Sequence, residues 1–191
     1  MCVSGSCKAC DRLNFFKKSI EREKQNKKPV KPKRPKSKTV CESSIDYYPY
    51  EIFPEDLNAL ETMFGGRVLE IADGVAAIVA QRHTNLTCVT LFVDSVHFIA
   101  PTKKGDTLVF KATVNRAWNT SLEVGVSVFA ENLKTKESRH VVSAYFTFVA
   151  LDNQRKPTLV PKLIVNSKKQ RQRYIQAGKR RKQRLLMNKG K

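Results

Sequence analysis

The stretch that decides the fold is residues 65–82, GGRVLEIADGVAAIVAQR. Apolar residues such as Val68, Val75 and Ile78 recur through it so closely that they cover nearly every side of a helix. A helix that is apolar all round is expected to be buried rather than to lie on a surface. The sequence therefore predicts one long buried helix that opens on the Gly65-Gly66 pair.

Four stretches rich in β-branched residues follow this helix. In one of them, Leu122, Val124, Val126 and Val128 alternate with polar or small residues, which is the period of a half-buried strand. Short polar links separate the later stretches, so we expect antiparallel neighbours. Only a curved sheet could cover the helix on most of its sides, which predicts an α+β fold. The four stretches are residues 87–99, 107–118, 121–130 and 139–152.

The net charge of +19 over 191 residues suggests a nucleic-acid-binding protein until its distribution is considered. Residues 1–40 carry +10, residues 41–160 carry −3, and residues 161–191 carry +12. The nearly neutral middle has the usual size of one compact domain. We therefore predict one domain over 45–161 between two basic arms.

The two arms differ in their expected order. The N-terminal arm, 1–44, includes KKPVKPKRPKSK (27–38), which has too few apolar side chains to fold, so we expect it to be disordered. The C-terminal extension, 162–191, contains Tyr174, Ile175, Leu185 and Leu186 among its basic residues. We expect part of it to form a helix on the body or on a partner subunit; the alternative is a solvated charge run.

Cysteine content and hydropathy indicate the compartment. Neither a signal peptide nor an apolar membrane span is recognisable in the sequence, so we expect a soluble, cytoplasmic protein with reduced thiols. The spacing of Cys2, Cys7 and Cys10 resembles half of a zinc site, but four ligands are needed. We expect free thiols on the arm and no metal.

Asp73 is the most informative polar residue. It lies in the middle of the apolar helix, where a charged carboxylate is costly unless it is paired or placed in a functional cavity. A structural role, on a helix side that reaches solvent or an interface, is the alternative. Glycines 65 and 66 would let a substrate approach the first-turn amides, whose dipole can polarise a carbonyl, although a plain tight turn is also possible.

Gly66 and Asp73 lie about two turns apart on one helix side, or roughly 10 Å along the axis. One helix cannot bring both its amide end and its own Asp73 to the same bond. Two antiparallel helices related by a two-fold axis could do so. The sequence therefore predicts a homodimer whose active site is shared.

Residues 53–73, FPEDLNALETMFGGRVLEIAD, resemble the active-site region of the hot-dog fold acyl-coenzyme A thioesterases. The resemblance continues through 93–96, 120–125 and 143–150, VDSV, TSLEVG and SAYFTFVA. It implies a central helix wrapped by a curved antiparallel sheet, and a lipid-metabolism enzyme that hydrolyses fatty acyl-CoA to fatty acid and coenzyme A. It also implies a homodimer, often a trimer of dimers, and no cofactor.

The same resemblance assigns the site residues. Asp73 would act as general base or as a nucleophile that forms an anhydride, and Asn58 would orient the water or the thioester. The oxyanion and substrate would contact Gly65, Gly66, Thr62 and Phe64. Glu61 departs from the family pattern, which usually has Gly there, and so does Ala72, where a Met is common.

Candidate coenzyme A contacts come from two further places, Thr120 and Ser121 in the body and Arg171 and Arg173 in the basic extension. A different class of function remains open from the sequence alone. In that alternative the body is a non-catalytic acyl-CoA sensor or scaffold, and the basic arms bind polyanions.

Overall fold

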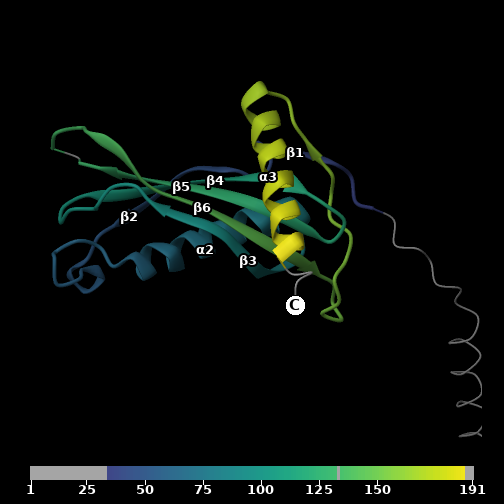
Figure 1. Cartoon of the computed structure of the whole chain (residues 1–191), viewed down its shortest axis with the longest axis horizontal. Coiled ribbons are helices and arrows are strands. Elements are labelled where there is room, and N and C mark those ends of the chain that lie inside the picture. The colour runs from purple at the N-terminus through teal and green to yellow at the C-terminus, as the bar shows by residue number, and fades with distance from the viewer. Residues whose placement is uncertain (1–33, 133, 188–191) are drawn as a thin grey trace, which may run out of the picture. The chain divides into compact units, whose positions relative to one another are not determined.

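The computed structural model describes residues 34–132 and 134–187. A five-stranded antiparallel sheet in the order β2-β4-β5-β6-β3 carries a long helix on each face (Figure 1). The strands are β2 (Ile45–Glu51), β3 (Thr87–Phe98), β4 (Thr107–Ala117), β5 (Ser121–Glu131) and β6 (Ser138–Leu151), and the helices are α2 (Gly65–Thr84) and α3 (Lys168–Met187). The predicted α+β hot-dog architecture is confirmed.

Helix α2 packs on one face of the sheet. It follows Phe64, whose backbone is extended, and ends at Asn85, which has a left-handed φ of 57°. One side of α2 is fully buried against apolar side chains of the strands, whereas Ile78 on another side is 40% exposed. The prediction of a helix covered on nearly every side is therefore wrong for the single chain, because the sheet covers one side of α2.

The three strands β4, β5 and β6 form a meander, as predicted from their short links. The remaining predicted strand, β3, returns to the far edge of the sheet and, among the described residues, pairs only with β6. Apolar side chains of β5 point toward α2, and Glu123 and Gly125 alternate with them on the other face. The period-2 pattern therefore placed the correct residues in the core.

The aromatic and acidic residues of the segment 46–55 predict a loop from the sequence alone, but the structure forms strand β2 there, so that prediction is wrong. The sequence of β2, IDYYPYE, contains Pro49, which lacks the N–H that an inner strand must donate. The structure places β2 at a sheet edge, where β4 is its one strand partner in the part of the chain that the structure describes. A proline is tolerated there because one side of the strand needs no partner.

Residues 34–44, which we assigned to the disordered arm, pack against the domain. Two short strands pair in parallel, β1 (Lys38–Thr39) and β7 (Leu163–Ile164). Arg34 donates hydrogen bonds to the carbonyl oxygens of Trp118 and Val160, at 3.0 and 3.1 Å. Residues 1–33 lie outside the described residues, so the predicted disorder of that part of the arm stays a prediction.

Helix α3 crosses the face of the sheet opposite α2 (Figure 1). This agrees with the expectation of a partly helical extension that lies on the body. In the described part of the chain, neither helix is both long and apolar enough to cross a bilayer.

Candidate active site

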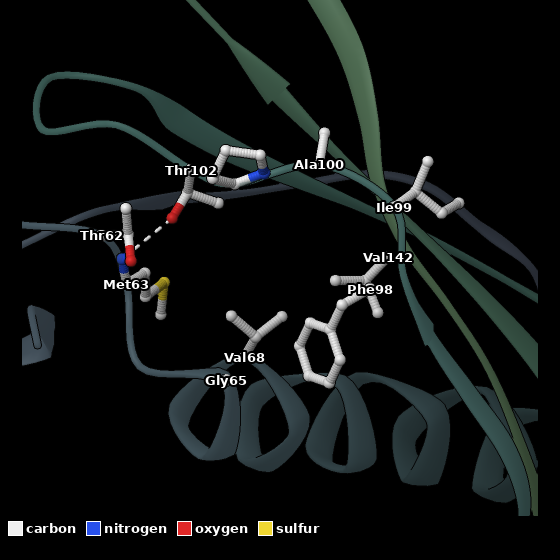
Figure 2. Close-up of a pocket in the computed structure, with 10 residues that line it drawn as sticks. Thr62, Met63, Gly65, Val68, Phe98, Ile99, Ala100, Thr102 and Val142 are labelled. Carbon is white, nitrogen blue, oxygen red and sulfur yellow. Dashed lines mark hydrogen bonds between the residues drawn. The ribbon is translucent and has the colours of Figure 1, made fainter. Parts of the chain in front are cut away.

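A cavity of about 370 Å³ opens between the start of α2 and the segment after β3 (Figure 2). Its lining includes Thr62, Gly65 and Val68 on one side and Phe98 and Thr102 on the other. The hydroxyl of Thr102 accepts a hydrogen bond of 2.9 Å from the Met63 amide, which fixes the two walls together. Two of the predicted site residues, Thr62 and Gly65, line this cavity.

The turn before α2 is held by Asn58. Its side-chain oxygen accepts hydrogen bonds from the amides of Leu60 and Thr62, at 2.9 and 3.2 Å, and its amide group donates to the Thr62 hydroxyl at 2.9 Å. Glu61, inside this turn, has a left-handed φ of 54°. A backbone of this kind favours glycine, which gives a physical reason for the Gly that the family pattern usually has there.

The remaining predicted residues at this end line a second hollow, of about 660 Å³, on the other side of the helix start. Asn58, Phe64 and Gly66 contribute to it. Its wall includes the buried Asp56, which accepts hydrogen bonds from Tyr50 and Arg67 as well as from the backbone. Burial alone would raise the pKa of Asp56, but these hydrogen bonds outweigh it and lower that pKa.

Gly65 permits a close approach at the first turn of α2. A Cβ atom at this position would lie 2.9 Å from the ring of Phe98, so a side chain there would displace the ring. At Gly66 a Cβ atom would meet the ring of Phe64 at 2.5 Å. The two glycines therefore let the rings of Phe98 and Phe64 pack directly on the helix start, where the first-turn amides carry the positive end of the helix dipole.

Asp73 is half-buried in the middle of α2 and lines neither of these two cavities. Its Oδ1 accepts a hydrogen bond of 2.8 Å from the hydroxyl of Thr90 on β3. Sequence reasoning missed Thr90, because the two residues are 17 positions apart and no local motif joins them. Only the pairing of β3 at the sheet edge brings that hydroxyl to α2.

The candidate coenzyme A residues do not form one cluster. Ser121 accepts a hydrogen bond from Arg181 at 3.1 Å, whereas Arg173 donates to Thr113 at 3.3 Å. Arg171 is exposed at the start of α3, and Thr120 precedes β5. Both engaged arginines lie on the sheet face opposite α2.

Sequence reasoning also missed how α3 uses its arginines. Arg180 forms a two-pronged contact with the fully buried Glu123, at 2.6 and 3.1 Å, and Arg184 pairs with Asp94 on β3. Burial would lower the pKa of Arg180, but its contact with Glu123 prevails and raises it. Arginines also stack on aromatic rings of the sheet, Arg180 on Tyr145 at 3.7 Å. The basic run is thus partly neutralised by acids of the body.

Among residues 34–132 and 134–187, no three His, Cys, Asp or Glu side chains group in a way that could hold a metal ion. Cys2, Cys7 and Cys10 lie outside these residues. His83, at the end of α2, is fully buried and contacts the Pro161 carbonyl oxygen at 3.2 Å. Burial lowers the pKa of His83, which fits a neutral structural side chain.

A five-stranded antiparallel sheet with the long helix α2 packed on one face, and with Asp73 in the middle of that helix, is the arrangement expected of a hot-dog protein of the thioesterase class. Residues 60–137 match the model of the thioesterase superfamily. The protein VdlD of Helicobacter pylori (strain ATCC 700392 / 26695) is 40% identical over 135 residues, which are 71% of this chain and 77% of VdlD. An uncharacterized acyl-CoA thioester hydrolase of Bacillus subtilis, YkhA, is 33% identical and covers 72% of this chain and 89% of its own.

Solved structures agree with these relatives. The acyl-CoA hydrolase of Staphylococcus aureus, in complex with butyryl coenzyme A and coenzyme A, superposes with a TM-score of 0.75 at 35% identity. The match covers 81% of this chain and 95% of that one. The chain therefore belongs to the acyl-CoA thioester hydrolase family of the thioesterase superfamily.

Proposed function

We propose that this protein hydrolyses fatty acyl-CoA at a site shared between two subunits, with Asp73 as general base or nucleophile. The observation that carries the proposal is the setting of Asp73. Its carboxylate is half-buried in an otherwise apolar stretch of α2, and its hydrogen-bond partner is the neutral hydroxyl of Thr90, 2.8 Å away. None of the ion pairs among the described residues involves this carboxylate, so its oxygens are available to a proton or to a carbonyl carbon.

The reaction would proceed at the start of α2. The thioester carbonyl oxygen docks at the amides of Gly65 and Gly66, which stabilise the oxyanion as it forms. In one route Asp73 removes a proton from water while the water oxygen attacks the carbonyl carbon, and the C–S bond then breaks. In the other, an oxygen of Asp73 attacks, the C–S bond breaks to leave an anhydride, and water then cleaves that anhydride. In both routes the thiolate leaves without strong acid assistance, because the pKa of its thiol is about 8.5. We propose that this reaction needs no metal or cofactor.

The open edge of β3 is the surface that we assign to the second subunit. Exposed apolar side chains follow this strand, including Leu91 at 63% and Val93 at 42% exposure. Their main-chain groups lie on a long edge that has no partner within the described chain on that side. Such an edge favours pairing with another strand, and a two-fold axis supplies the same strand from a second copy.

This pairing accounts for the distance between Asp73 and the helix start. In the single chain, Asp73 lies beside Thr90, and Gly65 lies beside Phe98. Asp94 is midway between Thr90 and Phe98, close to the middle of β3. Antiparallel self-pairing about Asp94 would set Asp73 and Thr90 beside the partner's Phe98 and the partner's Gly65.

Relatives support both parts of the proposal. The S. aureus hydrolase has been solved with an Asp, a Thr or an Asn replaced by Ala, the residue types of Asp73, Thr90 and Asn58. An acyl-CoA thioesterase with a TM-score of 0.77 and 33% identity is hexameric. We therefore propose a homodimer that assembles into a trimer of dimers. We also propose a cytoplasmic location, because a mouse relative with 29% identity is a cytosolic acyl-CoA thioester hydrolase.

The non-catalytic alternative, a polyanion-binding module, loses support from α3. Arg180 and Arg184 are paired with Glu123 and Asp94, and Arg173 and Arg181 donate to hydroxyl groups of the sheet. These cations serve the fold and are less available to an external polyanion.

The decisive experiment measures thiol release from acyl-CoA substrates across a range of chain lengths. Wild-type protein should release thiol, and Asp73→Asn, which keeps the volume of the side chain, should lower turnover on the order of 10³-fold. Its circular dichroism and melting temperature should stay close to those of the wild type. Unchanged turnover in this variant would remove Asp73 from the mechanism.

Mixing inactive variants tests whether the site is shared. Asp73→Asn and Asn58→Ala subunits, co-refolded, would form hybrid dimers in which one site takes both intact residues. Random pairing should restore about a quarter of wild-type turnover. If hybrids form and no activity returns, Asp73 and Asn58 act from the same chain or not together.

A further inference from the structure

A third cavity, of about 820 Å³, lies near the start of β3, at the opposite end of that strand from the start of α2. Amide side chains of Gln81 and Asn85, at the end of α2, line one side of it. Thr87 and Val89 of β3 contribute the edge-strand side, and Arg155 contributes the only cation. The mechanism proposed above uses none of these side chains.

Arg155 is held in an unfavourable backbone conformation. It has a left-handed φ of 60° in a tight loop after β6. The loop is fixed by Asp152, whose Oδ1 accepts hydrogen bonds from the amides of Gln154 and Lys156, at 2.8 and 2.9 Å. A left-handed conformation costs about 1–2 kcal/mol for a residue with a side chain, and such residues concentrate at ligand sites.

The charge of Arg155 is not used by the fold. The side chain is exposed, and none of the ion pairs or side-chain hydrogen bonds of the described residues involves its guanidinium. The carboxylate in the same cavity, Asp152, is occupied by its own loop. A guanidinium with five donors and no partner is suited to phosphate.

The proposed dimer joins this cavity to the active site. If β3 pairs with its copy about Asp94, its start at Thr87 and Val89 lies near the partner's residues 99–101, which follow directly on the end of the partner's β3. Residues 99 and 101 both line the cavity at the helix start. The cavity lined by Arg155 in one subunit would therefore continue into the cavity at the helix start of the other subunit.

We propose that Arg155 binds a phosphate group of the coenzyme A portion of the substrate, from the subunit that also supplies Asp73. The inference rests on the proposed function and extends it. The acyl thioester lies at the helix start of one subunit, and the pantetheine arm runs along the seam between the subunits. Amides of Gln81 and Asn85 offer donors and acceptors to that arm.

The test compares a substrate that carries the phosphates of coenzyme A with one that lacks them. Arg155→Ala should raise the KM for an acyl-CoA about 10-fold with little change in kcat. The KM for the same acyl group on pantetheine, which carries no phosphate, should not change. Arg155→Lys should recover most of the affinity, and Lys156→Ala, which alters an exposed cation outside the cavity, should behave as wild type.

Arg155→Gly divides a binding role from a structural one. Glycine relieves the left-handed backbone, so this variant should melt no lower than Arg155→Ala and yet show the same rise in KM. Equal rises for acyl-CoA and acyl-pantetheine, or no rise for acyl-CoA, would overturn the proposal.

Calorimetry with coenzyme A itself keeps this test independent of turnover. Arg155→Ala should weaken coenzyme A binding about 10-fold and leave pantetheine binding unchanged. An affinity for coenzyme A that does not change in Arg155→Ala would reject the role of Arg155, even if the wild type is an active thioesterase. Absence of thiol release by the wild type would reject the proposed function instead.

Discussion

Asp73 and Glu123 are carboxylates on opposite faces of the sheet, and they have different hydrogen-bond partners. Asp73 lies on α2, which covers one face, and Glu123 points from β5 to the face that α3 covers. Glu123 is fully buried, receives Arg180 in a two-pronged contact and accepts a further hydrogen bond of 3.0 Å from Asn115. Asp73 is half-buried and accepts one hydrogen bond, from the neutral Thr90. The two acids therefore differ both in burial and in the charge of the side chain that contacts them.

The kind of partner makes the distinction. A cation neutralises Glu123 and fixes its geometry, so its charge serves to hold α3 on the sheet. A hydroxyl donates to Asp73, and in the proposed mechanism this contact orients the carboxylate toward a proton or a carbonyl carbon. On this reasoning, changes at Glu123 should alter stability, and changes around Asp73 should alter turnover.

The largest expected effect is a loss of stability when Glu123 is replaced. Glu123→Gln leaves Arg180 without its charged partner, which should lower the free energy of unfolding by about 3 kcal/mol. Urea unfolding of Glu123→Gln, Arg180→Gln and the double variant would give the coupling energy between the two side chains. Turnover per folded molecule should be unchanged. A stable Glu123→Gln protein with lost turnover would reverse the roles that we assign to the two acids.

A smaller effect is expected at Thr90. Thr90→Val removes the hydroxyl with little change of shape, and we expect kcat to fall about 10-fold while the melting temperature holds. Thr90→Ser keeps the hydroxyl and should retain most of the activity. If the valine variant keeps wild-type kcat, the contact with Asp73 does not position the carboxylate.

The smallest effect is expected at Glu61, an exposed acid in a strained turn. Glu61→Gly should stabilise the fold by about 0.5 kcal/mol, because relief of the left-handed backbone exceeds the added entropy of the unfolded chain. Lys136→Gly is the matched control, since Lys136 has a φ of 59° outside the active-site turn. Both variants should gain stability, but only Glu61→Gly should shift the preference for acyl chain length in thiol release.

Most of the fold could be predicted from periodicity. The helix and four strands were placed within about two residues of their ends, because each has one apolar side facing a common core. Strand β2 was missed because Pro49 is compatible with a strand only at an edge, and edge position is a property of the whole sheet. The packing of residues 34–44 was missed because composition does not reveal contacts such as those of Arg34 with the segment near Val160.

The candidate site residues that have a local signal could be named from the sequence, and their catalytic roles stay predictions. The turn of Asn58 to Thr62, the glycines at the helix start and Asp73 lie within one short stretch of sequence. Thr90 and Arg155 gave no such signal, because their significance depends on the sheet edge and on a loop conformation. The partners of Arg180 and Arg184 lie 57 and 90 residues away, so the sequence could predict a helix on the body or a solvated charge run but not these ion pairs.

The parallel pairing of β1 with β7 has a consequence for the order of folding. Lys38 pairs with Leu163, and Arg34 reaches the Val160 carbonyl across 126 positions of the chain. The β4-β5-β6 meander closes only short loops, whereas this pairing must close almost the whole domain. We expect the β1-β7 pair to form last and to open first in hydrogen exchange. Its opening would free the segments that contain β1 and β7 while the five-stranded sheet and α2 stay folded.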